Sequence, residues 1–256
     1  MDDTPDLPRE IGPLDLLRGA SFPWRAALLL LRVPRLRRLA SLCAALTLLI
    51  FVLWAWGLRA WLPGLLERAW PHPDGAVGWL WELTLVIAGA LAWLLGAATL
   101  PLLALAPLED TLVAATESAV GAPPASPAGI ATAAGQALSA VARTALRVML
   151  FLLGQALLLV LQLALPAGAP LWAAAGVGWT ALFACAEYLD PPLARRGGGF
   201  AEVRRVLAQR TALALGFGLS VTLLLWVPLL NLFLLPVAVV AGTLLHRSLV
   251  SAGTLS

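Results

Sequence analysis

Three arginines stand close together near the amino end of the chain, at Arg35, Arg37 and Arg38. Pro34 precedes them and suits the first turn of a helix. We therefore expect the backbone N–H groups of Leu36, Arg37 and Arg38 near an unsatisfied helix N-terminus. Guanidinium groups, free N–H groups and the positive end of a helix supply hydrogen-bond donors and no acceptor. This stretch predicts a site for an oxyanion that carries no proton.

The same arginines have a second interpretation, because an uncharged run of 20 residues follows them at 39–58. At about 1.5 Å per residue such a helix spans roughly 30 Å, the thickness of the hydrocarbon core of a bilayer. Basic residues at the end of a membrane helix fix its orientation and contact lipid phosphates. An anion site and a topology signal with lipid contacts both remain open at this point.

Composition identifies the class of protein. The chain is 61% hydrophobic and 12% charged, with a mean hydropathy of +0.89. Soluble domains average about 45–50% apolar and about 25% charged residues. We therefore predict an all-α integral membrane protein. Cys43 and Cys185 each lie in an apolar run and are interpreted as small buried hydrophobic residues, without the spacing of a metal site or a disulfide.

The chain lacks the residue patterns of an enzyme. His72 and His246 are isolated, and the apolar segments contain no carboxylate that could pair with either. The glycine pairs at 176–178 and 216–218 lack the third glycine and the preceding strand of a nucleotide-binding motif. We expect no catalytic residue, no cofactor, no metal and no nucleic-acid partner.

Residues 14–108 predict a surface helix followed by two membrane helices. Arginines recur every seven positions in the amphipathic segment 14–31, which is expected on the membrane surface. Residues 39–58 and 83–108 are the two membrane helices, and 59–82 is expected to be a polar connection. Tryptophans near the end of the first helix indicate where it reaches the far membrane–water interface. Small residues on the second helix predict a face through which it packs closely against another helix. The arginines are Arg18, Arg25 and Arg32, the tryptophans are Trp54, Trp56 and Trp61, and the small residues are Gly89, Ala92 and Gly96.

Two further apolar blocks, 148–186 and 211–245, are each interrupted near the middle by prolines, at 165–170 and 228–236. Each predicts a helical hairpin, either re-entrant or fully spanning. Between them, residues 200–207 predict an interfacial helix with an apolar stripe of Phe200, Val203, Val206 and Leu207.

Three amides lie inside these apolar blocks. Gln155 and Gln162 share one helical face, and an interhelical hydrogen bond is favoured over a role in lining a transport path. Asn231 is expected at the tip of the second hairpin, where it caps backbone groups or contacts a substrate.

The arginine distribution predicts the topology. If both hairpins return to the side they left, 15 of the 17 arginines share one side of the membrane and 2 lie on the other. The crowded side is then cytoplasmic, which places both termini in the cytoplasm.

Several segments together carry a resemblance to a known family. They are EYLDPPLARRGGGFAEVRRVL at 187–207, GFGLSVTLLLWVPLLNLFLLPVAVVAGTLL at 216–245, APLEDTLVAATESAVG at 106–121 and LLRGASFPWRAALLLLRVPRLRRL at 16–39. Over about residues 12–247 the chain resembles the CysZ family of bacterial inner-membrane sulfate transporters, which is related to the etoposide-induced membrane proteins. Leu36, Arg37 and Arg38 match the family's sulfate-binding motif, and Arg35 stands where members have glycine.

The resemblance implies two long transmembrane helices, two partly penetrating hairpins and a homo-oligomer. It also implies a sulfate permease of the bacterial inner membrane that feeds cysteine synthesis. We expect a loose segment at 1–13, one membrane domain at 14–247 and a short tail at 248–256. Two alternatives remain: a transporter of another anion, and a non-transporting scaffold of the same fold whose arginines bind anionic lipid headgroups.

Overall fold

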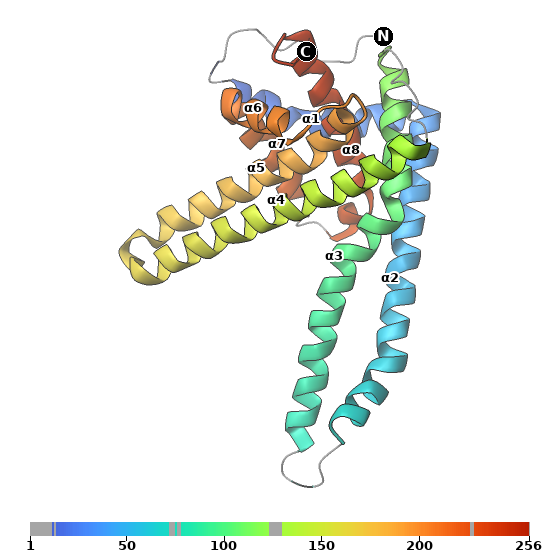
Figure 1. Ribbon diagram of the computed structural model, residues 1–256, viewed down its shortest axis with the longest axis vertical. Coiled ribbons are helices and arrows are strands. Elements are labelled where there is room, and N and C mark those ends of the chain that lie inside the picture. Colours follow the sequence, from blue (N-terminus) through green and yellow to red (C-terminus); the bar gives the residue numbers. More distant parts are fainter. Residues whose placement is uncertain are drawn as a thin grey trace. The chain divides into compact units, whose positions relative to one another are not determined.

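The computed structural model describes residues 12, 14–71, 75, 78–122, 130–225 and 228–255, with the backbone alone described at 97–99, 101–104, 106–107, 130–144, 225 and 228–234. In this part of the chain every regular element is a helix (Figure 1), so the all-α prediction is confirmed. The elements are α1 (Asp15–Arg32), α2 (Pro34–Ala69), α3 (Gly78–Ala119), α4 (Ile130–Ala164), η1 (Pro166–Gly168), α5 (Ala169–Ala194), α6 (Phe200–Gln209), α7 (Thr211–Leu225) and α8 (Pro228–Ser251).

Four segments among the described residues are long and apolar enough to cross a membrane. They are Pro34–Ala69, Gly78–Gly96, Ala145–Ala164 and Pro166–Ala194, and α6 with α7, bent by 104°, is a fifth candidate. The chain is therefore a multi-pass membrane protein.

Contacts divide the chain into two compact units. The first comprises Met1–Ala40 and Glu109–Ser256, and the second comprises Ser41–Leu108. Helices α2 and α3 each run from one unit into the other. The single domain at 14–247, the loose segment at 1–13 and the tail at 248–256 stay predictions.

The second unit is a pair of helices packed through small residues. Trp54 Nε1 donates a hydrogen bond to the Ala92 carbonyl oxygen at 3.2 Å. A Cβ atom at Gly96 would overlap the Trp54 indole, and one at Gly89 would lie 3.4 Å from Leu62. The predicted packing face is confirmed, because only small residues admit the indole so closely.

Trp54 lies between the two helices, whereas Trp56 and Trp61 are 65% and 70% exposed. The position of these tryptophans at the far membrane interface stays a prediction. One detail of the predicted segment is wrong. The expected polar connection at 59–82 is largely helical, since α2 continues to Ala69 through Pro63 and α3 starts at Gly78. A proline removes one helical hydrogen bond and bends a helix, and it need not end one whose neighbouring turns remain intact.

Both predicted hairpins are present in the first unit. In the first hairpin the short helix η1 joins α4 to α5, at the predicted proline-containing tip. In the second, α8 already begins at Pro228, a residue suited to the first helical turn. The expected tip at 228–236 is therefore helical, and Asn231 lies inside α8. The Asn231 side chain lies outside the described residues.

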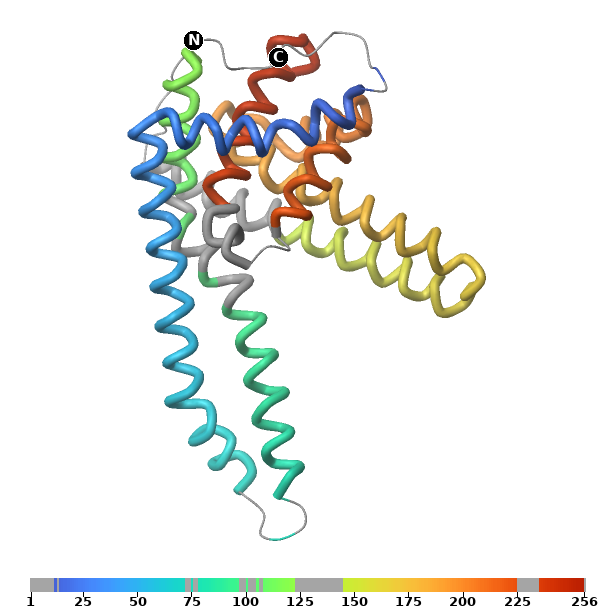
Figure 2. Tube along the Cα trace, turned by 180° about the vertical axis from the view of Figure 1, so that it is seen from behind, coloured from blue at the N-terminus to red at the C-terminus, as the bar shows by residue number. Residues whose placement is uncertain are grey.

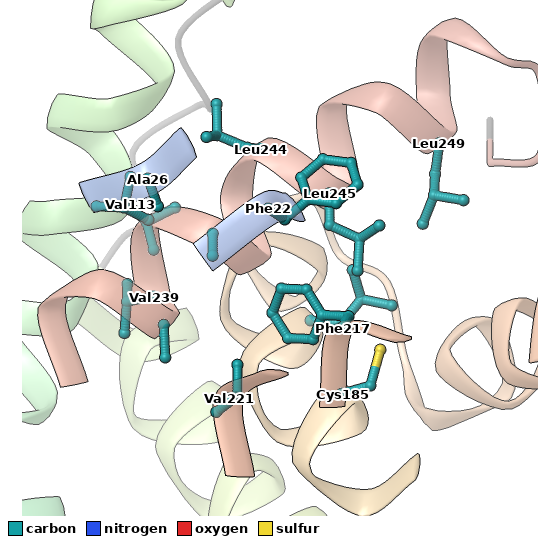
Figure 3. Close-up of a cluster of buried hydrophobic side chains, with 14 of the residues drawn as sticks. Phe22, Ala26, Val113, Cys185, Phe217, Val221, Val239, Leu244, Leu245 and Leu249 are labelled. Atoms are coloured by element: carbon teal, nitrogen blue, oxygen red, sulfur yellow. The ribbon is translucent and has the colours of Figure 1, made fainter. Parts of the chain in front are cut away.

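The core of the first unit is formed where α1 crosses α7 and α8 (Figure 2). The fully buried rings of Phe22 and Phe217 lie among aliphatic side chains of α8 such as Leu245 (Figure 3). A Cβ atom at Gly216 would overlap the Leu16 carbonyl, so the backbones of α1 and α7 touch. One apolar face of α1 thus packs against protein, and the expected position of α1 on the membrane surface stays a prediction.

Candidate functional site

The arginine cluster lies at a sharp corner between α1 and α2. Val33 is extended (φ −96°, ψ 108°), because the residue before a proline is disfavoured in the helical region. The next helix then starts at Pro34, as predicted. Leu36 is 0% exposed and belongs to the hydrophobic core of the first unit. Its burial fixes the first turn of α2 on the protein.

The three guanidinium-bearing side chains point away from this anchor. Arg35, Arg37 and Arg38 are all exposed, while Leu36 and Ala40 are buried on the inner face of the same turns. The helix period accounts for this alternation, since positions 36 and 40 lie on one face. The structure thus presents three positive side chains on the surface at the start of one helix. Whether they hold sulfate stays a proposal.

One part of the predicted donor set is wrong. The Arg37 N–H donates to the Val33 carbonyl oxygen at 3.0 Å, because Val33 precedes the first helical residue and accepts the first intrahelical bond. Helix geometry likewise commits the Arg38 N–H to the Pro34 carbonyl. Among the described residues, the N–H groups that lack a carbonyl partner at this helix start belong to Arg35 and Leu36. The cluster therefore offers backbone donors at Arg35 and Leu36, and side-chain donors at the arginines.

A second polar region lies between α4, α5 and α7, around a cavity of about 590 Å³ lined by Gln155, Gln162, Thr180 and Thr222 among apolar residues. Gln155 Nε2 donates to Thr180 Oγ1 at 2.9 Å, which confirms the predicted interhelical hydrogen bond. Thr180 in turn donates to the Gly176 carbonyl oxygen at 2.9 Å. Gln162 borders the same cavity, so the two predicted amides are brought together. A path-lining role for either stays a proposal.

Sequence reasoning missed the contribution of the threonines. The Thr222 Oγ1 atom is buried and has no hydrogen-bond partner among the described residues. A buried hydroxyl without a partner costs free energy, which a bound polar group would recover. Neither Thr180 nor Thr222 has a local sequence signal, because threonine is common in membrane helices and only the packing of three helices brings them together.

Buried ion pairs form a third polar feature that the sequence did not reveal. Glu117 is 2% exposed, and its Oε1 atom lies 3.1 Å from Arg196 Nη2. Arg195 Nε lies 3.7 Å from the other oxygen of Glu117. Arg147 Nη2 contacts Asp190 Oδ2 at 3.2 Å. Arginines 195, 196 and 147 therefore neutralise carboxylates inside the protein, as buried charges require, rather than serving mainly as contacts for lipid phosphate.

Two titratable groups near these pairs have shifted pKa values. The pKa of Glu109 is raised to about 7 by burial, and then by the negative charges of Glu187 and Asp110. The pKa of His246 is lowered to about 4 by burial, and then by the positive charges of Arg196 and Arg247. At neutral pH His246 is thus uncharged, while Glu109 is close to its titration midpoint.

The two cysteines are buried, as predicted, and they form no disulfide among the described residues. Cys43 is 1% exposed and Cys185 is 0% exposed. Cys185 belongs to the hydrophobic core of the first unit, where a thiol acts as a small hydrophobic group.

The chain is similar to curated proteins named sulfate transporter CysZ. Two of them, from a Classical Ogawa strain and an El Tor Inaba strain of Vibrio cholerae serotype O1, are each 37% identical to it over 98 residues. That stretch covers 38% of this chain and 39% of each relative's length. The model of the sulfate transporter CysZ/etoposide-induced protein 2.4 family matches a longer region, residues 22–236. This region contains the arginine corner, the first hairpin, α7 and the start of α8. The chain therefore belongs to the sulfate transporter CysZ/etoposide-induced protein 2.4 family.

Proposed function

We propose that this protein is a sulfate permease of the bacterial inner membrane, acting as a homo-oligomer and supplying sulfate for cysteine synthesis. The observation that carries the proposal is the arginine corner. Burial of Leu36 fixes the first turn of α2, and Arg35, Arg37 and Arg38 project outward from it. Guanidinium forks match the oxygens of a tetrahedral dianion.

The membrane orientation is part of the same proposal. With both hairpins returning to the side they left, 15 of 17 arginines are cytoplasmic, and so are the two termini. Arg37 and Arg38 then stand at the cytoplasmic mouth of the path. Arg35 stands where the family has glycine, and it adds a guanidinium group as a hydrogen-bond donor beside its backbone N–H.

The path itself is proposed to run past Gln155 and Gln162, with Asn231 from the second hairpin. The cavity between α4, α5 and α7 supports this route, because two amides and two hydroxyls lie among its apolar walls and none of the described residues that line it is charged. Neutral donors can accompany an anion without trapping it, which conduction requires. The bond from Gln155 to Thr180 must then exchange for a bond to the anion during passage.

Radiolabelled sulfate flux into proteoliposomes tests the function. We expect Arg37→Ala/Arg38→Ala to lower the flux at low sulfate at least about tenfold, since a hydrogen bond to a charged group contributes about 1.5–3 kcal/mol. The matched control is Arg204→Ala/Arg205→Ala, which removes two exposed arginines from α6. Equal sulfate flux in both double variants would show that Arg37 and Arg38 do not form the sulfate site.

A second candidate function is a membrane scaffold that binds anionic lipid headgroups. The exposure of Arg35, Arg37 and Arg38 favours it, because surface arginines beside a membrane helix commonly bind lipid phosphate. A wild-type protein that gives no flux of sulfate, phosphate or chloride, yet binds vesicles containing phosphatidylglycerol, would support the scaffold. Flux of phosphate in preference to sulfate would instead indicate a transporter of another oxyanion.

A further inference from the structure

Helix α1 keeps an apolar stripe on its outer surface in addition to the one it buries. Leu17, Trp24 and Leu31 recur every seven residues and are 64%, 70% and 66% exposed. Positions seven apart lie almost above one another on a helix of 3.6 residues per turn. The core already uses the opposite side of α1, through Phe22, Ala26 and Leu29. The outer stripe is therefore unexplained by the packing of the first unit.

Each residue of this stripe is followed directly by an arginine, so Arg18, Arg25 and Arg32 form a parallel line beside it. Arg18 contacts Asp15 Oδ1 at 3.0 Å. Arg25 and Arg32 border a cavity of about 190 Å³, whose remaining walls are Leu28, Leu29 and Leu244. This cavity combines two positive side chains at its rim with an apolar floor.

The combination fits a ligand with an anionic head and an apolar body. Two guanidinium groups can bind a phosphate with paired hydrogen bonds. Leucine side chains contribute nothing to a fully hydrated inorganic anion, whereas they favour a lipid glycerol and acyl chains. An exposed tryptophan between two exposed leucines is the usual composition of a helix lying at the membrane interface.

A purely structural explanation covers only part of these observations. Arg32 lies in the last turn of α1, where a positive charge complements the helix dipole. That reason does not apply to Arg25, which lies in the middle of the helix. It also leaves the exposed stripe of Leu17, Trp24 and Leu31 without a role.

We propose that the cavity between Arg25 and Arg32 binds the phosphate of an anionic phospholipid, whose acyl chains lie along Leu17, Trp24 and Leu31. Because α1 packs on α7 and α8, the bound lipid holds the core of the first unit at the membrane surface. This site is separate from Arg35, Arg37 and Arg38, and it does not rest on sulfate conduction.

Native mass spectrometry of the purified full-length protein tests the site, with palmitoyl-oleoyl phosphatidylglycerol as the probe and the matching phosphatidylcholine as the neutral comparison. Each basic residue near an anionic lipid surface contributes about a fivefold gain in affinity, so Arg25→Gln/Arg32→Gln is expected to weaken phosphatidylglycerol binding about thirtyfold. The control Arg204→Gln/Arg205→Gln is expected to bind as the wild type does. Equal phosphatidylglycerol binding by both double variants would overturn the proposal.

Two further arms keep the test decisive. Leu17→Gln/Leu31→Gln is expected to weaken phosphatidylglycerol binding severalfold while leaving all arginines in place. Inorganic phosphate at the same concentration should fail to displace the lipid, and displacement would assign the cavity to a free oxyanion and overturn the lipid assignment. If the circular dichroism of the double arginine variant shows that it has lost its helices, Arg25→Gln is tested alone. Its affinity for phosphatidylglycerol is expected to fall about fivefold. Binding by that single variant equal to the wild type would then overturn the proposal.

Discussion

Replacing Asp15 with alanine leaves the guanidinium of Arg210 buried without its carboxylate, and we expect a large loss of stability. Asp15 is 0% exposed and Arg210 is 3% exposed, with Arg210 Nη1 3.2 Å from Asp15 Oδ2. Arg210 stands at the corner where α6 meets α7 at 104°. The ion pair therefore ties the start of α1 to this corner.

The size of the effect follows from burial. Breaking a buried ion pair by removing one partner costs about 3–5 kcal/mol. For a chain of this size about 1 kcal/mol shifts Tm by roughly 2–4 °C, so Asp15→Ala should lower Tm by about 6–20 °C. Thermal unfolding in detergent, followed by circular dichroism at one protein concentration, measures this shift.

Two variants show whether burial is the cause. Arg18→Ala removes the other partner of Asp15. Because the Arg18 side chain is 37% exposed, solvent screens this contact, and its loss should cost at most about 1 kcal/mol. Asp15→Leu/Arg210→Met replaces both charges by apolar groups and should recover most of the lost Tm. Equal shifts for Asp15→Ala and Arg18→Ala, or a double variant less stable than Asp15→Ala, would refute the reasoning.

The remaining predictions concern packing and pH. Gly216→Ala should lower Tm, because the added Cβ atom would overlap the α1 backbone. Gly57 has open space around it, so Gly57→Ala should raise the free energy of unfolding by up to about 1 kcal/mol. A higher Tm for Gly216→Ala than for Gly57→Ala would contradict the packing. The raised pKa of Glu109, about 7, stabilises the fold below pH 4.5, and this stability is lost as the pH rises through 7. A Tm profile of Glu109→Gln should lack that loss. The lowered pKa of His246, about 4, gives stability above pH 6.5 that is lost as the pH falls towards 4. His246→Gln should lack this acid loss, and a profile identical to the wild type would show that His246 is not responsible.

Features governed by local sequence could be predicted. The glycine and alanine face of α3 followed from helical spacing, and the first hairpin tip followed from Pro166. The start of α2 followed from Pro34, a residue suited to the first helical turn. In each case neighbouring residues alone determine the geometry.

Features that depend on distant packing could not be predicted. Asp15 and Arg210 are 195 positions apart, and neither residue has a local pattern that marks it as buried. Gly216 was recognised only as an incomplete nucleotide motif, although its role is to let α7 touch α1. Thr222 faces the cavity only because α4, α5 and α7 meet around it.

The predicted donor set of the arginine corner failed for a local reason. With Pro34 as the first helical residue, Arg37 is the fourth, so its N–H enters the helix ladder. Leu36 contributes its N–H, and its side chain anchors the turn instead of contacting solvent.

The central claim is that Arg37 and Arg38 bind sulfate. Calorimetric titration of the purified protein with sulfate, phosphate and chloride tests it most directly, comparing the wild type with Arg37→Ala/Arg38→Ala and with the control Arg204→Ala/Arg205→Ala. We expect saturable sulfate binding, stronger than that of phosphate or chloride, which the first double variant loses and the control retains. Sulfate binding of equal affinity in both double variants, or none in the wild type, would contradict the claim.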